Sequence, residues 1–138
     1  MSDEMRGWSQ PKAGTFCWTE IGCSDSAKSM EFFKNVFGWE FKAGGGTDGG
    51  MEYNEFSTTA GAEQVGGLYQ ADPAWGMPPH IMNYIAVDDV DENTARAEQL
   101  GAKVHRKMDV PGVGRIAIIE DPTGAMFATY KQGEERHG

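Results

Sequence analysis

The sequence has few residues of the kinds that form disulfide bonds or metal sites, since its 138 residues include only two cysteines and three histidines. Cys17 and Cys23 lie on one predicted strand, about 20 Å apart at ~3.3 Å per residue, which is too far for a disulfide bond. We therefore interpret both as small, partly buried hydrophobic residues without a redox role.

The sequence also lacks long apolar runs and an excess of positive charge. No stretch approaches the roughly 20 apolar residues of a membrane helix, and residues 1–10 lack the basic and apolar regions of a signal peptide. The formal net charge of −9 argues against a nucleic-acid or anionic-membrane surface. We expect a cytoplasmic protein with no nucleic-acid or membrane partner, whereas a small neutral or cationic partner remains open.

The hydrophobic residues, 39% of the chain, suffice for the core of one compact domain. A polar first segment predicts a flexible N-terminal arm over residues 1–13, and residues 133–138 form a tail. Between them the pattern strand, helix, three strands occurs twice, which predicts two modules packed about a pseudo-twofold axis. The predicted domain is 14–132, with modules 14–70 and 80–132 joined by a proline-rich linker, 71–79, in which regular structure is not expected.

Capping residues and periodicity set the predicted elements. In the first module Ser24 or Asp25 caps a helix that Gly38 ends, with Ala27, Met30, Phe33 and Phe37 on one apolar stripe. In the second, Asp89 and Glu92 form a capping box and Gly101 ends the helix. Predicted strands cover 15–21, 39–42, 51–57, 64–70, 80–88, 103–107, 115–120 and 125–131, and the glycine-rich segment 43–50 is predicted to be a mobile hairpin tip.

The last two strands form the clearest local feature, a hairpin closed by Asp121-Pro122-Thr123-Gly124. Asp can bond the backbone at the first position of such a turn, Pro presets φ at the second, and Gly suits the fourth. Because side chains alternate along a strand, Met126, Ala128 and Tyr130 face one way and Phe127 and Thr129 the other.

Three segments together resemble a known family: AKSMEFFKNVFGWEF, YIAVDDVDENTARAEQLGAKV and PGVGRIAIIEDPTGAMFATY. They are similar to the vicinal oxygen chelate superfamily of glyoxalase I, bleomycin-resistance proteins and extradiol dioxygenases, and the chain is closest to single-domain glyoxalase-like members. The resemblance covers roughly residues 14–132. It implies an α+β fold of two βαβββ modules that form an open barrel-like cleft, commonly completed in a homodimer.

Metal-dependent members of this family carry His, Glu or Gln at four cleft positions. The resemblance places Phe16, Gly67, Met82 and Ala128 at those positions, and none offers a nitrogen or oxygen side-chain ligand. We therefore predict no metal and no cofactor, with a divalent metal bound near His80 as the alternative. Glu20 is the one candidate for catalysis, either as a cleft carboxylate that binds a cation or takes a proton, or as a solvated residue at a strand end.

The predicted cleft is lined by aromatic and thioether side chains with few polar groups, which suits a flat or partly apolar small molecule. The same side chains could instead fill a closed core, an interpretation that we favour for Phe16 and Met82. Three functions follow: metal-free small-molecule binding, a metal-dependent lyase or dioxygenase with non-standard ligands, and a non-catalytic structural or regulatory homodimer. The predicted ligand-binding residues are Phe16, Trp18, Glu20, Gly67, Tyr69, Met82, Tyr84, Met126, Ala128 and Tyr130.

Overall fold

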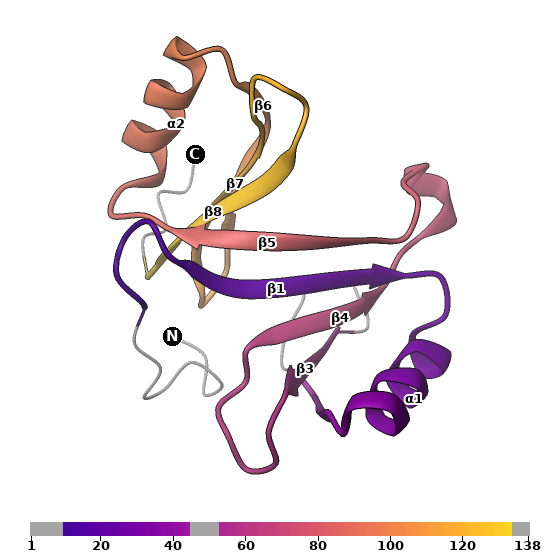
Figure 1. Cartoon of the computed structure of the whole chain (residues 1–138). Helices are drawn as coiled ribbons and strands as arrows, with labels where there is room; N and C mark the ends of the chain where they lie inside the picture. The colour runs from indigo at the N-terminus through magenta and orange to yellow at the C-terminus, as the bar shows by residue number, and fades with distance from the viewer. Residues whose placement is uncertain (1–9, 45–52, 134–138) are drawn as a thin grey trace. The chain divides into compact units, whose positions relative to one another are not determined.

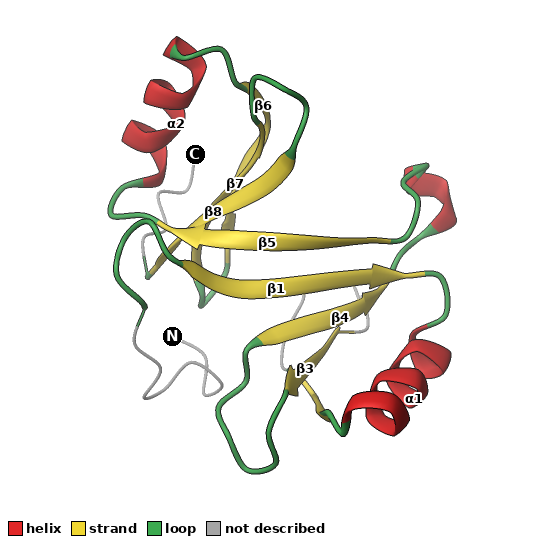
Figure 2. Ribbon diagram, viewed as in Figure 1, coloured by secondary structure: helices red, strands yellow, loops and turns green. Residues whose placement is uncertain are grey.

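The computed structural model describes residues 10–44 and 53–133, which fall into two compact units. Of the described residues, one unit comprises those within 18–81, and the other combines 10–17 with 82–133. Within the described residues, each unit contains a mixed sheet and one α-helix (Figure 2). No helix in the described part of the chain is long and apolar enough to cross a membrane.

The unit of residues 18–81 follows the order strand, helix, three strands (Figure 1). Its strands adjoin in the order β2-β3-β4-β1, with β1 and β4 parallel and the other neighbours antiparallel. The first two residues of β1 belong to the other unit. The elements are β1 (Phe16–Cys23), α1 (Ser26–Phe37), β2 (Glu40–Ala43), β3 (Tyr53–Ser57) and β4 (Gly66–Gln70).

Helix α1 begins and ends where the sequence indicates. The Asp25 carboxylate accepts a hydrogen bond from the backbone N–H of Lys28, and Gly38 ends the helix with φ of 76°. Met30 and Phe33 pack against the core, as predicted, but Ala27 and Phe37 are exposed. The predicted stripe is therefore only half correct, because helix and sheet touch along a narrower band. The buried core below α1 consists of Ile21, Cys23, Phe56 and Leu68.

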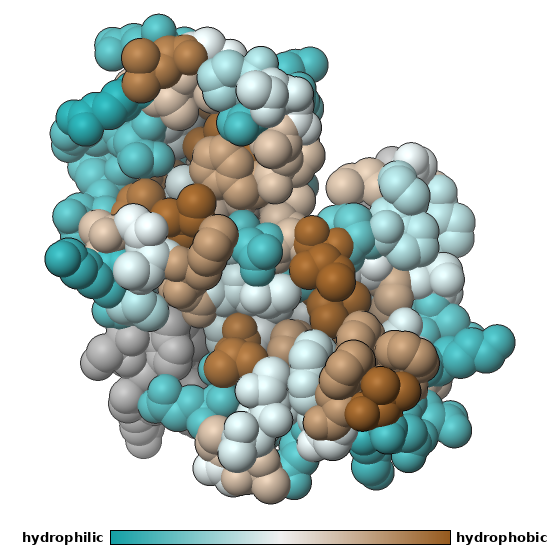
Figure 3. All heavy atoms as spheres, viewed as in Figure 1, coloured by the Kyte–Doolittle hydropathy of each residue, from teal (hydrophilic) through white to brown (hydrophobic). Residues whose placement is uncertain are grey.

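The outer side of α1 carries an apolar patch formed by Phe32, Val36 and Phe37, each more than half exposed. Apolar atoms gather over this helix in the space-filling view (Figure 3). The Phe32 ring contacts the Phe33 ring edge-on, and the Phe37 ring stacks on the Phe33 ring. The patch therefore continues directly into the aromatic packing under the helix.

The unit that contains residues 82–138 repeats the same order of elements. Its strands adjoin as β5-β8-β7-β6, with β5 parallel to β8 and the remaining pairs antiparallel. The first two residues of β5 belong to the other unit. The elements are β5 (His80–Ala86), α2 (Val90–Gln99), β6 (Lys103–Val110), β7 (Gly114–Glu120) and β8 (Met126–Gln132).

Helix α2 has the predicted start, since the Asp89 side chain accepts from the backbone N–H of Glu92. Gly101 follows the helix with φ of 97°. Phe127 packs against the core below α2, so the helix covers the face of β8 opposite to that of Ala128. That core consists of Val87, Val90, Ala117 and Ile119.

The α+β fold of two βαβββ modules is confirmed, and the structure differs from the sequence prediction in local details. The proline-rich segment is not wholly irregular, because Asp72 caps a short 3-10 helix, Pro73–Trp75. Gln10 was predicted to be in a flexible arm, yet its amide nitrogen donates to the carbonyl oxygens of Val87 and Tyr130. Of the predicted glycine-rich hairpin tip, residues 45–50 lie outside the described residues.

The turn between β7 and β8 is held by one carboxylate. Oδ1 of Asp121 accepts hydrogen bonds from the backbone N–H of Thr123 and Ala125 and from the Thr123 hydroxyl, at 2.7–3.0 Å. These bonds hold the pKa of Asp121 below its usual value, and the bond from the backbone N–H of Ala125 has the largest effect.

We predict that this turn makes the fold sensitive to acid. A carboxyl group whose pKa is lowered by folding stabilises the fold fully above its unfolded pKa of about 3.9, and this contribution is lost as the pH falls through the folded-state pKa. The free energy of unfolding, measured by chemical denaturation, should fall between neutral pH and about pH 3. This fall should be larger for the wild type than for Asp121→Asn, whose side chain does not titrate. Equal losses would contradict the prediction.

Candidate functional site

The predicted site residues lie in both units. Trp18, Glu20, Gly67, Tyr69 and the metal candidate His80 belong to the unit of residues 18–81. The other unit holds Phe16, Met82, Tyr84, Met126, Ala128 and Tyr130. Side-chain hydrogen bonds that involve Trp18, Glu20 and Tyr69 occur in the first set, which therefore forms the candidate site.

Glu20 projects from the face of the sheet that α1 does not cover. Ile21 and Cys23 on β1 are buried in the core under α1. Because successive side chains on a strand point to opposite faces, Glu20 and Gly22 lie on the other face. β1 pairs with β4 in a register that sets Glu20 beside Gly67, so both belong to one surface.

A chain of two hydrogen bonds holds the Glu20 carboxylate. The indole Nε1 of Trp18 donates to the hydroxyl oxygen of Tyr53 at 2.9 Å. The same Tyr53 hydroxyl donates to Oε2 of Glu20 at 3.0 Å. A carboxylate that accepts a hydrogen bond beside two aromatic rings suits the recognition of a cation, because the faces of Trp and Tyr rings also attract positive charge.

The absence of a side chain at Gly67 makes this arrangement feasible. A Cβ atom at Gly67 would lie 2.0 Å from the hydroxyl oxygen of Tyr53 and 2.1 Å from its ring carbon Cζ. Tyr53 therefore lies directly over the glycine backbone, which brings its hydroxyl to Glu20 on the adjacent strand.

A second pair of side chains lies over Gly22. The hydroxyl oxygen of Tyr69 is 3.1 Å from Nε2 of His80, and Nδ1 of His80 is 3.0 Å from the carbonyl oxygen of Pro78. A Cβ atom at Gly22 would be 2.6 Å from the Tyr69 hydroxyl and 3.0 Å from Cε1 of His80. Gly22 and Gly67 thus leave room on one face for two tyrosine hydroxyls.

The electrostatic surroundings keep Tyr69 protonated. Burial first, and then electrostatic interaction with Glu20 and Cys23, raise the pKa of its hydroxyl to about 12. Tyr69 is consequently a hydrogen-bonding group here and not a nucleophile or base at neutral pH.

The structure adds two residues that the sequence analysis did not select, Tyr53 and Glu55 on β3. Tyr53 pairs with Tyr69 across the strands, and Glu55 pairs with Gly67. Glu55 is only 7% exposed, so a second acidic side chain is buried beside the same glycine. The sequence indicates that Tyr53 and Glu55 share one face of the predicted strand 51–57, because side chains alternate along a strand. It does not show whether this face of the strand is the one on the same side of the sheet as Glu20.

Of the predicted residues in the other unit, Met82, Tyr84, Ala128 and Tyr130 are buried, whereas Phe16 and Met126 are exposed. Ala128 is fully buried and pairs with Tyr84 on β5. Met82 is buried, as the core interpretation predicted, whereas Phe16 is 69% exposed, so that interpretation was wrong for Phe16. Burial raises the pKa of Tyr130, whose hydroxyl donates to the carbonyl oxygen of Val113.

The residues present do not fit the metal site that the family resemblance implies. The described residues contain no group of three His, Cys, Asp or Glu side chains that could hold a metal ion. Both ring nitrogens of His80, the metal candidate, lie within hydrogen-bond distance of Tyr69 and Pro78.

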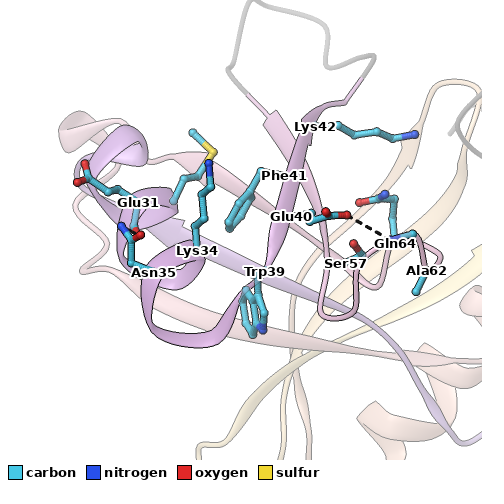
Figure 4. A pocket seen from close by; sticks show the side chains of 12 residues that line it. Glu31, Lys34, Asn35, Trp39, Glu40, Phe41, Lys42, Ser57, Ala62 and Gln64 are labelled. Atoms are coloured by element: carbon cyan, nitrogen blue, oxygen red, sulfur yellow. Dashed lines mark hydrogen bonds between the residues drawn. The ribbon is translucent and has the colours of Figure 1, made fainter.

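A hollow of about 720 Å³ occurs elsewhere in the same unit, around the edge strand β2. Phe41 and Lys34 lie on one side of β2, and Glu40, Lys42 and Gln64 lie on the other (Figure 4). Because this hollow wraps around a strand edge and does not include Glu20, we consider the Glu20 surface the better candidate.

Comparison with known proteins agrees with the fold and the order of elements. A sequence model of the Glyoxalase/Bleomycin resistance protein/Dioxygenase superfamily matches residues 15–129. The anthracycline biosynthesis protein DnrV of Streptomyces peucetius is 33% identical over 132 residues, covering 87% of this chain and 48% of DnrV. The protein CFP32 of Mycobacterium tuberculosis is 32% identical over 130 residues, covering 91% of this chain and 47% of CFP32.

The chain spans about half the length of these curated relatives. Among solved structures, methylmalonyl-CoA epimerase from Mycobacterium tuberculosis matches with a TM-score of 0.63 and 15% sequence identity, covering 93% of this chain and 95% of the epimerase. At this level of identity the likeness concerns the fold alone.

Proposed function

Since the chain belongs to the Glyoxalase/Bleomycin resistance protein/Dioxygenase superfamily, we propose that it binds a small aromatic cation on the Glu20 surface, without a metal ion. The observation that carries this proposal is the Glu20 carboxylate, which accepts the Tyr53 hydroxyl at 3.0 Å beside the Trp18 ring. A charged nitrogen would pair with the carboxylate while the ring system of the ligand packs on the aromatic side chains.

Three further features support a cationic, aromatic ligand. Glu55 adds a second acidic side chain to the same surface, and the whole chain carries a formal net charge of −9. A negative protein attracts cationic ligands over distances of about 10 Å at moderate salt. Two relatives are named for the biosynthesis of anthracyclines, which are planar aromatic compounds, and this supports the choice of an anthracycline as the probe.

We predict that Glu20→Gln weakens binding of an anthracycline whose sugar carries a primary amine by about tenfold or more, because a hydrogen bond to a charged group is worth about 1.5–3 kcal/mol. Isothermal titration calorimetry with the wild type and the variant gives the two dissociation constants. The N-acetylated anthracycline, which is neutral, should bind both proteins with similar, weaker affinity.

The matched control is Glu31→Gln, which removes the same charge from an exposed position of α1. It should leave the affinity nearly unchanged, since an exposed charge is screened by solvent. A preceding treatment with EDTA should leave the wild-type affinity unchanged as well. Equal affinity for the amine and its N-acetyl form, or loss of binding after EDTA treatment, would contradict the proposed function.

A further inference from the structure

Strand β2 is the end strand of the sheet in its unit, since it pairs with β3 alone among the described strands. The hollow of about 720 Å³ extends along this strand, and Glu40, Phe41 and Lys42 are in its lining. The close-up shows their side chains on the two sides of β2 (Figure 4). A strand edge that adjoins open space is a template for pairing with another strand.

The hydrogen bonds between β2 and β3 show which backbone groups point to the open edge. The N–H of Gly44, the residue that follows β2, donates to the carbonyl oxygen of Tyr53 at 2.9 Å. Alternate residues of an antiparallel strand bond to the same neighbour, so Lys42 also bonds to β3. The N–H and C=O groups of Phe41 and Ala43 therefore point away from β3, and no backbone–backbone hydrogen bond to them occurs among the described residues.

The side chains next to Phe41 make this edge complementary to itself. Glu40 and Lys42 are exposed and lie on the face of β2 opposite to that of Phe41, which packs against the core under α1. In an antiparallel pair of two copies with Phe41 opposite Phe41, Glu40 of each copy lies opposite Lys42 of the other. The two Phe41 backbones then exchange both of their hydrogen bonds.

Other antiparallel registers of two β2 strands lack this match. A shift by one residue sets the open backbone groups of one copy opposite groups of the other copy that already bond to β3. A shift by two residues places Glu40 opposite Glu40 in one direction and Lys42 opposite Lys42 in the other. Cross-strand pairs of opposite charge stabilise a sheet and pairs of like charge destabilise it, so charge and hydrogen-bond direction favour the same register.

The strand at the other end of the sheet order, β6, is protected against such pairing. It carries Lys103, Arg106 and Lys107, and its register with β7 shifts between Val104 and Arg106. Charges of one sign and β-bulges on an edge strand both hinder pairing with another chain. Strand β2 has no register shift, and its single lysine is matched by a glutamate.

We propose that β2 is the surface through which two copies of this chain associate, as an antiparallel strand pair about a twofold axis at Phe41. Each copy supplies the same strand, so the contact is isologous. Two backbone hydrogen bonds join the Phe41 residues, and two pairs of Glu40 with Lys42 flank them. The proposed dimer is independent of the proposed ligand, because the side chains of the Glu20 surface lie on other strands.

Sedimentation velocity of charge variants of the full chain tests this pairing. The wild type should show a monomer–dimer equilibrium at concentrations up to about 1 mM. Glu40→Lys and Lys42→Glu each replace two attractive pairs by two repulsive ones and should weaken dimerisation by about tenfold or more. An equimolar mixture of the two variants should recover a dimer with nearly wild-type affinity, because the lysines of one variant then lie opposite the glutamates of the other.

The matched control is Lys28→Glu, which makes the same change of charge at an exposed position of α1 and should dimerise as the wild type does. Circular dichroism establishes that each variant is folded. The proposed dimer is refuted if the wild type stays monomeric at about 1 mM, or if both single variants dimerise like the wild type. A mixture of the two folded variants that stays monomeric refutes it as well.

A further variant, Ala43→Pro, tests the backbone pairing without a change of charge. Ala43 is exposed and its N–H points away from β3, so proline there removes no hydrogen bond of the monomer. In the dimer proline removes a donor at the paired edge and should weaken dimerisation by about tenfold or more, with unchanged circular dichroism. Dimerisation of Ala43→Pro at wild-type affinity would exclude pairing through this edge. If Ala43→Pro does not fold, the charge variants alone decide the test.

Discussion

Replacement of Arg115 by methionine is expected to lower the free energy of unfolding by about 3 kcal/mol or more, because it removes a buried guanidinium group that two partly buried carboxylates share. The Arg115 side chain is only 3% exposed on β7. Its Nη1 donates to Asp109 on β6 at 2.9 Å, and its Nη2 donates to Asp91 on α2 at 3.1 Å. One guanidinium group on β7 therefore joins α2 to β6 within their own unit.

The pKa values of this network have opposing causes. Burial acts to raise the pKa of Asp91, but the hydrogen bonds and charges of Arg115 and Lys107 outweigh it and hold the pKa below the usual value. For Arg115 burial acts to lower the pKa, and the two carboxylates outweigh it. The charged forms of the network thus stabilise one another in the folded state, which is why loss of the guanidinium should be costly.

Urea denaturation of Arg115→Met and of Arg96→Met gives the comparison. Arg96 forms a 3.7 Å ion pair with Glu92 in which both side chains are 71% exposed, and such a pair is worth about 0–1 kcal/mol. Methionine retains much of the side-chain volume in both variants. The triple variant Arg115→Met, Asp91→Asn, Asp109→Asn should recover part of the lost stability, because it removes the two carboxylate charges that Arg115 no longer neutralises. A loss below about 1 kcal/mol in Arg115→Met would show that the buried network does not stabilise the fold.

A second large effect is expected from Gly66→Ala, which should destabilise the protein by more than about 3 kcal/mol. Gly66 is buried on β4, between Thr19 of β1 and Phe56 of β3. A Cβ atom there would be 2.1 Å from the carbonyl oxygen of Thr19 and 2.5 Å from Cζ of Phe56. The Thr19 oxygen belongs to the backbone of a paired strand, so relief of this clash requires the two strands to separate.

The neighbouring variant Gly67→Ala is the matched control. Its Cβ atom would also be too close to another atom, at 2.0 Å, but that atom is the hydroxyl oxygen of the Tyr53 side chain. A side chain can rotate away where a backbone cannot, so thermal and chemical denaturation should show a smaller loss for Gly67→Ala. If the two variants were equally destabilised, the distinction between backbone and side-chain clashes at this sheet would be refuted.

The fold was predictable because its signals are local. Asp25 and Gly38 bound α1, Asp89 caps α2, and the carboxylate of Asp121 organises the last turn, all through contacts within a few residues of the chain. The predicted stripe on α1 was only partly correct, since the 3.6-residue period gives the direction of the apolar face and not the width of its contact with the sheet. The exposure of Phe37 follows from that width.

The candidate site was less predictable because it depends on contacts between distant segments. The alternation of side chains placed Trp18 and Glu20 on one face of a strand, and the sequence therefore identified Glu20 as a candidate. It did not identify Tyr53, which is 33 residues away and reaches Glu20 only because β3, β4 and β1 adjoin in one register. His80 was considered for its metal-binding chemistry, whereas the structure pairs it with Tyr69.

The sequence by itself determined the family, the two βαβββ modules and the absence of nitrogen or oxygen ligands at Phe16, Gly67, Met82 and Ala128, since these follow from residue type and local pattern. Only the tertiary structure decided that Gly67 supports Tyr53 and that the Glu20 carboxylate receives its hydroxyl. The physical reason is that the role of a glycine in a strand depends on which atoms occupy the space that a side chain would fill. Those atoms come from distant segments of the chain that strand pairing brings beside the glycine.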